Sequence, residues 1–341
     1  MPTFLDSTSV LDDPPALRSR MHRDGYLFIR DLLPADELAA LRLGFLAIAR
    51  DYGWVQKTTP MEDAIADQDG FCVEPTSEYM DVYRHMYALP QFHALQHHPA
   101  LVDLLEKVLD GPVLPPPRRI GRPNFPKRES FTTPPHQDFI PIQGSAETIT
   151  AWFPLHDLSP VKEGGLEVAT SSHQGGVYEF QPALGAGGLA ITDPLEDTWI
   201  GGPFAQGDVL LFHSMTAHRG VPNTGESLRL SIDARYQRIA DPIAPGSLLP
   251  HSQPNTWENI YADWPDENLQ YYWRQHDLQI TDYDDSYHQE RDRQALTLGE
   301  QGNPIAVSVL QRIIARDNNP KKRQRAAELL AAIEDGEASN P

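Results

Sequence analysis

The sequence contains a single cysteine, Cys72, among 341 residues. The chain therefore cannot form an internal disulfide, and it lacks the paired cysteines of a zinc ribbon or an iron–sulfur cluster. No stretch approaches the ~18 consecutive apolar residues of a membrane-spanning helix, and the N-terminus lacks the basic and apolar segments of a signal peptide. These absences predict a cytoplasmic protein without a membrane partner.

Basic residues are also scarce, with 28 Lys and Arg against 48 Asp and Glu and a formal net charge of −20. A charge of this sign repels polyanions such as nucleic acids, so we expect no nucleic-acid partner. Proline and glycine, in contrast, are abundant, at 31 and 23 residues. Both concentrate in turns and sheet corners, which favours a turn-rich β architecture. The sequence leaves the oligomeric state open.

The first third of the chain, residues 1–112, is predicted to be rich in helix. A short strand is expected at 25–30, followed by a helix from Pro34 whose apolar residues recur at steps of three and four. A second amphipathic helical stretch is expected from about Pro90 to Asp110, where Asp-Gly-Pro is a strong stop signal.

Residues 113–240 contain short apolar or alternating runs separated by turn residues, which is typical of an all-β sandwich or barrel. We therefore expect one domain over 1–245 and an extension over 246–341 that packs on it. The extension should end in a helical hairpin formed by residues 305–316 and 322–333.

Eight aromatic residues crowd the stretch from Trp257 to Tyr287, interleaved with acidic residues. One interpretation is a satellite core that fastens the extension to the barrel. The other is a lid or a subunit contact that favours an aromatic or cationic substrate.

The triplet His136-Gln137-Asp138 is the first candidate for chemistry, because residues two apart in an extended segment point to the same face. A strand then leads to His218, and a further strand begins near Arg229. The turn between them is centred on Asn223-Thr224. We therefore predict a hairpin in which His218 and Arg229 face each other with Cβ atoms about 5 Å apart.

Two histidines and one carboxylate on barrel strands form the facial triad that holds non-haem Fe(II) and leaves positions open for substrate and oxygen. The fork of Arg229 suits a carboxylate and would anchor a dicarboxylate co-substrate. His213 competes with His218 as the third ligand but lies in the wrong register to oppose Arg229, and His173 is better explained as a turn residue.

These residues, together with Gly25–Ile29, Glu163–Val168 and Ser172-His173, resemble the phytanoyl-CoA dioxygenase family of Fe(II)/2-oxoglutarate oxygenases over about residues 20–240. The resemblance implies a mainly β fold with flanking helices and a double-stranded β-helix, or jelly-roll, core of the cupin-like type. It also implies that His136, Asp138 and His218 bind Fe(II) and that Arg229 binds the distal carboxylate of 2-oxoglutarate.

The same resemblance implies that Gln137 and Trp152 line the co-substrate pocket, although Trp152 would also serve as barrel filling. Family members often carry a small hydroxyl residue where this chain has Gly220, so one hydrogen bond to the co-substrate is expected to be missing. Related halogenases replace the carboxylate ligand, and its presence here as Asp138 favours hydroxylation of a small organic molecule by O2, with release of succinate and CO2.

A basic cluster precedes the metal motif and includes Arg118 and Arg122. It is either surface charge that balances nearby acids or a site where one or two arginines meet a carboxylate or phosphate of the substrate. Other functions stay open at this point: a cupin-like metalloenzyme that does not use 2-oxoglutarate, a non-catalytic ligand-binding barrel and, more remotely, a zinc hydrolase.

Overall fold

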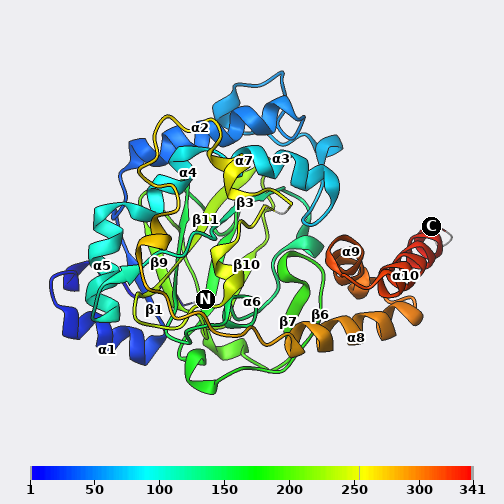
Figure 1. Cartoon of the computed structure of the whole chain (residues 1–341). Helices are drawn as coiled ribbons and strands as arrows, with labels where there is room; N and C mark the ends of the chain where they lie inside the picture. Colours follow the sequence, from blue (N-terminus) through cyan, green and yellow to red (C-terminus); the bar gives the residue numbers. More distant parts are fainter. Residues whose placement is uncertain (1, 253, 339–341) are drawn as a thin grey trace.

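A computed structural model describes residues 2–252 and 254–338 (Figure 1). Its centre is an antiparallel sheet in the order β1-β9-β4-β11-β2, with β3 also paired to β11. The strands are β1 (Tyr26–Ile29), β2 (Val113–Leu114), β3 (Ile120–Asn124), β4 (Ile149–Pro154), β9 (Val209–His213) and β11 (Arg229–Arg238).

A second sheet has the order β10-β5-β8. It consists of β5 (Gly165–Ala169), β8 (Trp199–Ile200) and β10 (His218–Val221), and a separate pair is formed by β6 (Phe180–Pro182) and β7 (Leu189–Ile191). An apolar cluster that joins residues of β1, β4 and β9 to residues of β5 and β8 fills the space between the two larger sheets. The fold is therefore mainly β with flanking helices around a jelly-roll core, as the sequence predicted.

The strands of the main sheet are buried on both faces. In β1, Leu27 and Ile29 join the large core under the helices, whereas Tyr26 and Phe28 join the cluster between the sheets. In β11 the apolar residues Leu230, Ile232, Ala234 and Tyr236 face the helix side. Because side chains alternate along a strand, the residues between them face the barrel interior. That inner face of β11 carries polar groups.

Helices cover the outer face of the main sheet (Figure 1). They are α1 (Pro14–Asp24), α2 (Ala35–Asp51), α3 (Ser77–Tyr87), α4 (Pro90–Ala94), α5 (Pro99–Leu109) and, from beyond the barrel, α7 (Trp257–Tyr261). The helix expected from Pro34 is thus confirmed. The stretch expected from Pro90 to Asp110 is instead broken between α4 and α5, because His98 precedes a proline and adopts an extended ψ of 128°.

The C-terminal helices are α8 (Ser286–Glu300), α9 (Val307–Arg316) and α10 (Pro320–Ala338), while α6 (Phe139–Ile142) is a single turn inside the barrel region. The hairpin of α9 and α10 was predicted, but α8 was not, because its polar sequence shows weak periodicity. The three helices share their own apolar core, which includes Ala295, Leu310 and Leu329. They stand beside the barrel in Figure 1.

The aromatic stretch divides between these two parts. Trp257, Tyr261 and Trp273 belong to the large core. Tyr283 donates a hydrogen bond to the backbone oxygen of Ile140, 3.1 Å away. The aromatic residues therefore fasten the chain to the barrel, and the helices that follow carry the cavity wall described below. Within the described residues, no helix combines the length and the apolarity that crossing a membrane requires.

Candidate active site

The two histidines and the aspartate converge between the sheets. His136 lies in an extended segment that pairs with β10, and its backbone N–H and C=O both bond to those of His218 at 2.9 Å. Asp138 follows at the start of α6. The Nε2 atoms of His136 and His218 each lie 3.9 Å from Oδ1 of Asp138. Among the described residues this is the one trio of His, Cys, Asp or Glu side chains grouped closely enough to hold a metal.

Hydrogen bonds orient all three side chains. Nδ1 of His136 lies 2.9 Å from the backbone oxygen of Pro134, and Nδ1 of His218 lies 3.0 Å from that of Thr216. Each Nδ1 must donate to its carbonyl, so each Nε2 keeps a free lone pair on the side of the ring that lies near Asp138. This tautomer is the one that a metal ligand requires. The donor set therefore fits a divalent cation.

The charge states fit as well. Burial lowers the pKa of His136 to about 3 and also lowers the pKa of His218, so both imidazoles are neutral at neutral pH. Burial alone would raise the pKa of Asp138, but Arg235 and the two histidines outweigh it and hold that pKa below its usual value. Nη2 of Arg235 donates to Oδ1 at 3.0 Å, and the Thr150 hydroxyl donates to Oδ2 at 2.6 Å.

The predicted hairpin between His218 and Arg229 is wrong. Strand β10 pairs with β5, where His218 faces Val168, whereas β11 pairs with β3 and β4, where Arg229 faces Asn124. The segment 222–228 crosses from one sheet to the other instead of reversing within one. It begins with a proline, which cannot donate a ladder hydrogen bond.

His218 and Arg229 nevertheless line the same small cavity, of about 100 Å³, because the two sheets face each other. Trp152 lines it too, and its ring packs edge-on against Phe204 at 4.8 Å. Gly220 also lines this cavity, and a Cβ added there would lie 3.0 Å from Thr132 Cγ2. Trp152 therefore fills the barrel and borders the cavity at once.

Arg229 is buried without a carboxylate partner in the described part of the chain. Its Nη1 donates to the backbone oxygens of Glu163 at 3.1 Å, Gly165 at 3.4 Å and Val221 at 2.8 Å. Its Nε has no hydrogen-bond partner. Burial lowers the pKa of Arg229 to about 10. The Arg229 guanidinium is thus a buried cation that three backbone carbonyls hold in place.

Gln137 does not line the cavity that contains Arg229. It points away from the cavity, as alternation between His136 and Asp138 requires. Its amide donates at 2.7 Å to the backbone oxygens of Gly176 and Met215, and its oxygen accepts from the N–H of Tyr178. The expected co-substrate contact of Gln137 is therefore corrected to a structural role. His213 and His173 lie close to each other, with ring centroids 5.4 Å apart, and neither belongs to the trio.

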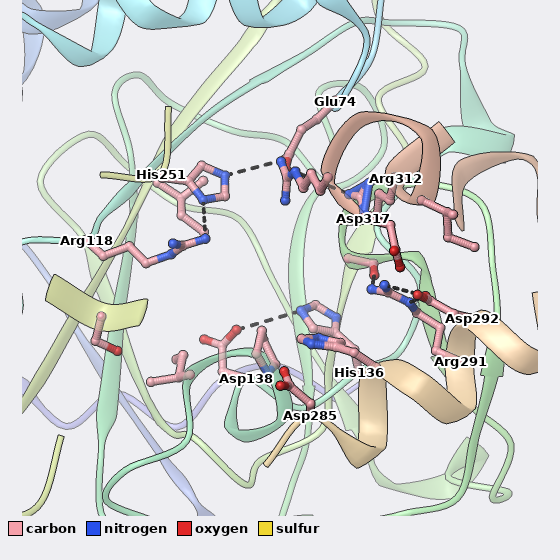
Figure 2. A pocket seen from close by; sticks show the side chains of 18 of the residues that line it. Glu74, Arg118, His136, Asp138, His251, Asp285, Arg291, Asp292, Arg312 and Asp317 are labelled. Atoms are coloured by element: carbon pink, nitrogen blue, oxygen red, sulfur yellow. Dashed lines mark hydrogen bonds and ion pairs between the residues drawn. The ribbon is translucent and has the colours of Figure 1, made fainter. Parts of the chain in front are cut away.

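His136 and Asp138 also line a larger cavity of about 520 Å³ (Figure 2), which shares Glu74, Arg122 and His136 with the smaller one. Arg118 and Arg122 both line the larger cavity. Nε of Arg122 pairs with Asp233 Oδ2 at 2.8 Å, and Arg118 donates to the Gly246 backbone oxygen and to His251 Nδ1. The basic cluster thus reaches the cavity wall, although Arg122 is already neutralised.

Several lining residues were missed from the sequence. Asp233 and Arg235 lie an even number of positions after Arg229 in β11 and so face the same side of the sheet. Counting alternate residues from Arg229 could have found them. Residues of α8 and α9, including Arg291 and Arg312, also line the larger cavity. No local signal in the sequence indicated that these distant helices return to the site.

Comparisons with known proteins identify the family of this chain. The sequence profile of the family described as phytanoyl-CoA dioxygenase (PhyH) matches residues 21–231. The chain is 28% identical over 264 residues to a 1-deoxypentalenic acid 11-beta-hydroxylase of Streptomyces exfoliatus, which covers 72% of this chain and 89% of the relative. A hydroxylase of the same name from Streptomyces arenae is 28% identical over 262 residues, with the same coverage.

Two solved structures are similar to this chain at lower identity. The non-haem alpha-ketoglutarate-dependent carbocyclase SnoK of nogalamycin biosynthesis is 21% identical, with a TM-score of 0.47, over 72% of this chain and 90% of its own. EvdO2 of Micromonospora carbonacea var. aurantiaca, complexed with 2-oxoglutarate, is 19% identical, with a TM-score of 0.45, over 69% and 92%. The family profile matches more than half of this chain. The chain therefore belongs to the phytanoyl-CoA dioxygenase family of Fe(II)- and 2-oxoglutarate-dependent oxygenases.

Proposed function

We propose that His136, Asp138 and His218 hold the iron of this Fe(II)- and 2-oxoglutarate-dependent oxygenase, and that it hydroxylates a small organic molecule. The observation that carries the proposal is the grouping of three ligand atoms, in which the Nε2 atoms of both histidines lie 3.9 Å from Oδ1 of Asp138. Two neutral imidazoles and one carboxylate are the facial donor set of non-haem Fe(II). The two histidines donate hydrogen bonds to the backbone oxygens of Pro134 and Thr216, and Asp138 accepts one from the Thr150 hydroxyl. These bonds prevent the three side chains from rotating away.

Arg229 is proposed to bind the distal carboxylate of 2-oxoglutarate. It is a buried cation whose hydrogen bonds, in the described part of the chain, all use Nη1 and reach only neutral carbonyls. An incoming carboxylate would supply the missing charge and occupy the Nε–Nη2 edge of the guanidinium. His218 borders the same cavity, so a co-substrate anchored on Arg229 extends toward the proposed iron site. Trp152 would form the wall beside it.

Bound Fe(II) supplies the coordination positions at which 2-oxoglutarate and O2 react. In the balanced reaction, one oxygen atom of O2 enters a C–H bond of the substrate and the other enters succinate, while the C1 carboxylate of 2-oxoglutarate leaves as CO2. Asp138 would supply the carboxylate ligand that related halogenases replace with a small residue to make room for a halide, which supports hydroxylation. The relatives named as hydroxylases of 1-deoxypentalenic acid support the same reaction on a small molecule.

The substrate is proposed to enter the larger cavity, which is lined by His136 and Asp138 but not by Arg229. Arg118 and Arg122 line this cavity and are proposed to contact the substrate. Arg118 has only neutral acceptors, whereas Arg122 already has a carboxylate partner. Arg118 is therefore the better placed of the two to meet a negative group.

The test is an anaerobic titration of Fe(II) and then 2-oxoglutarate into metal-free protein, followed by the visible metal-to-ligand charge-transfer band of the chelated keto acid. We expect the band in the wild type and in His213→Ala, because His213 lies outside the trio, and its loss in His218→Ala. Iron binding without a band would contradict the use of 2-oxoglutarate and favour a cupin-like enzyme. Failure to bind iron would refute the metal assignment.

A further inference from the structure

The larger cavity carries an excess of positive charge in a protein whose formal net charge is −20. Six arginines and one lysine line it, against five carboxylates. Part of this charge is balanced locally. Asp292 pairs with Arg291 and with Lys322, each at 2.7 Å, and Asp317 pairs with the same Lys322 at 2.7 Å. The imbalance is therefore concentrated elsewhere in the cavity.

The excess lies around Glu74, at the end of the cavity opposite the proposed iron ligands (Figure 2). Nη2 of Arg316 lies 3.1 Å from Glu74 Oε1, and Nη2 of Arg312 lies 3.9 Å from the same oxygen. His251, 3.5 Å from Oε2, adds no charge, because burial lowers its pKa to about 4. Arg118 also faces this end through His251. Two arginines thus share one carboxylate, and Arg118 is separated from it by a neutral histidine.

Arg312 is the least satisfied of the three. Its side chain is 5% exposed, compared with 41% for Arg316. Its only ion pair in the described part of the chain is the 3.9 Å contact with Glu74, and its Nη1 is buried without a hydrogen-bond partner. Burial lowers the pKa of Arg312 to about 10. A buried cation with unmet donors is costly, and an anionic ligand would remove that cost.

The backbone of α9 holds Arg312 at the cavity wall. Its neighbours Val309 and Ile313 are buried in the core shared by α8, α9 and α10. The Ser308 hydroxyl, also on α9, accepts a hydrogen bond from the N–H of Gly185 at 3.2 Å and so ties the helix to the barrel side. Arg312 lies outside residues 21–231, which match the family profile. It is therefore a contribution of the C-terminal helices of this chain.

An apolar recess of about 40 Å³ adjoins the same cavity beside His136. Its walls include Ile140, Phe180, Leu189 and Ile191. His136, Pro141, Gly187 and His288 border both spaces, so the recess and the charged cavity are continuous along one wall. A ligand that spans them meets hydrocarbon near the proposed iron ligands and positive charge at the far end.

We propose that the substrate is a carboxylic acid with a compact apolar skeleton, and that Arg312 binds its carboxylate while the recess receives the skeleton beside the iron site. The inference rests on the proposed function, because it takes His136 and Asp138 as the reacting end. Arg118 assists from the opposite wall. The C-terminal helices then determine substrate specificity, in addition to closing the cavity.

The experiment compares acids with neutral analogues of the same shape. Cyclohexanecarboxylic acid and 1-adamantanecarboxylic acid, each beside its methyl ester, are added to the Fe(II)- and 2-oxoglutarate-loaded protein. The readouts are the shift of the charge-transfer band without O2 and succinate release with O2. We expect saturable responses to at least one acid and none to its ester.

The variants are Arg312→Gln, Arg312→Lys and the matched control Arg293→Gln. Arg293 lies on α8, is exposed and pairs with Glu290 at 2.6 Å, and it does not line the cavity. Loss of a charged hydrogen bond should raise the apparent Kd and KM for the acid by roughly 10- to 100-fold in Arg312→Gln, with a smaller rise in Arg312→Lys and none in the control. Glu74 keeps Arg316 at 3.1 Å in these variants, so folding should be preserved.

An ester that responds as well as its acid would overturn the inference, and so would an unchanged KM in Arg312→Gln or a panel in which no acid responds. Cyclohexyl phosphate is included, and tighter binding of this ester than of the acids would overturn the assignment to a carboxylate. The band of bound 2-oxoglutarate must appear in wild type and in every variant. Its absence from the wild type would mean that the proposed function fails, which is a different result from the failure of the Arg312 site.

Discussion

Replacing Arg229 with glutamine tests the link between the burial of this cation and co-substrate affinity. Arg229 is 7% exposed, and its Nη1 is held by the backbone oxygens of Glu163, Gly165 and Val221. These bonds fix the guanidinium but do not neutralise it. Nε has no partner, so the Nε–Nη2 edge is available to a carboxylate. A glutamine keeps a donor there but removes the charge and the fork.

The magnitude follows from the number of charged hydrogen bonds lost. Each is worth about 1.5–3 kcal/mol, and a bidentate carboxylate would make two with the free edge of Arg229. The glutamine amide should recover about 1 kcal/mol as a neutral bond. The net loss of about 2–5 kcal/mol corresponds to a Kd for 2-oxoglutarate that is roughly 30- to 4,000-fold higher. Arg229→Lys should fall between glutamine and wild type, because it keeps the charge without the fork.

The assay is the anaerobic titration of the charge-transfer band with 2-oxoglutarate, at an Fe(II) concentration that saturates each variant. Iron binding is measured separately and should be unchanged, because Arg229 contacts neither the histidines nor Asp138. A Kd for 2-oxoglutarate within about threefold of wild type in Arg229→Gln would refute the reasoning. In that case the co-substrate would have to be anchored by another group.

Three further predictions follow from single contacts. Gly164→Ala should lower the free energy of unfolding by about 2–5 kcal/mol in urea titrations and weaken 2-oxoglutarate binding, because Gly164 has φ +75° and an added Cβ would lie 2.8 Å from Nη1 of Arg229. Arg122→Ala should raise the substrate KM about tenfold while uncoupled 2-oxoglutarate turnover persists, and an unchanged KM would exclude a substrate contact. Burial would raise the pKa of Glu74, but His251 and two arginines of α9 lower it well below 4.5. A carboxyl whose pKa is lower in the folded than in the unfolded protein stabilises the fold above the unfolded pKa, and this stabilisation is lost as the pH falls. The unfolding free energy of wild type should therefore drop more steeply below pH 4.5 than that of Glu74→Gln. Parallel curves of unfolding free energy against pH would contradict this prediction.

Several strands and the pair of His136 and Asp138 could be predicted because their signals are local. Short apolar runs between turn residues indicate β1, β4 and β9, and the spacing of His136 and Asp138 in an extended segment brings both to one side. The helix from Ala35 to Asp51 follows from steps of three and four in its apolar residues. Such patterns depend only on the backbone geometry of the segment itself, so they can be read from a short stretch of sequence.

Strand pairing depends on contacts between distant segments, and the sequence interpretation failed there. The distance along the chain between His218 and Arg229 suggested a hairpin, but β10 and β11 join different sheets and meet across the barrel. His136, His218 and Arg229 nevertheless line one cavity. Opposite sheets bring inward-facing residues together just as a hairpin would, so the wrong pairing still placed the right residues near one another.

The sequence by itself determined the class of the fold and singled out His136, Asp138, His218 and Arg229, because residue type, short spacing and family resemblance carry that information. Only the tertiary structure decided that Arg235 donates a hydrogen bond to Asp138 and that Gln137 turns away from the small cavity of Arg229. It also decided that Arg312 of α9 lines the larger cavity. These relations join segments up to 174 positions apart, from Asp138 to Arg312. The packing of helices against the barrel brings such segments together, and no periodicity within a single segment records it.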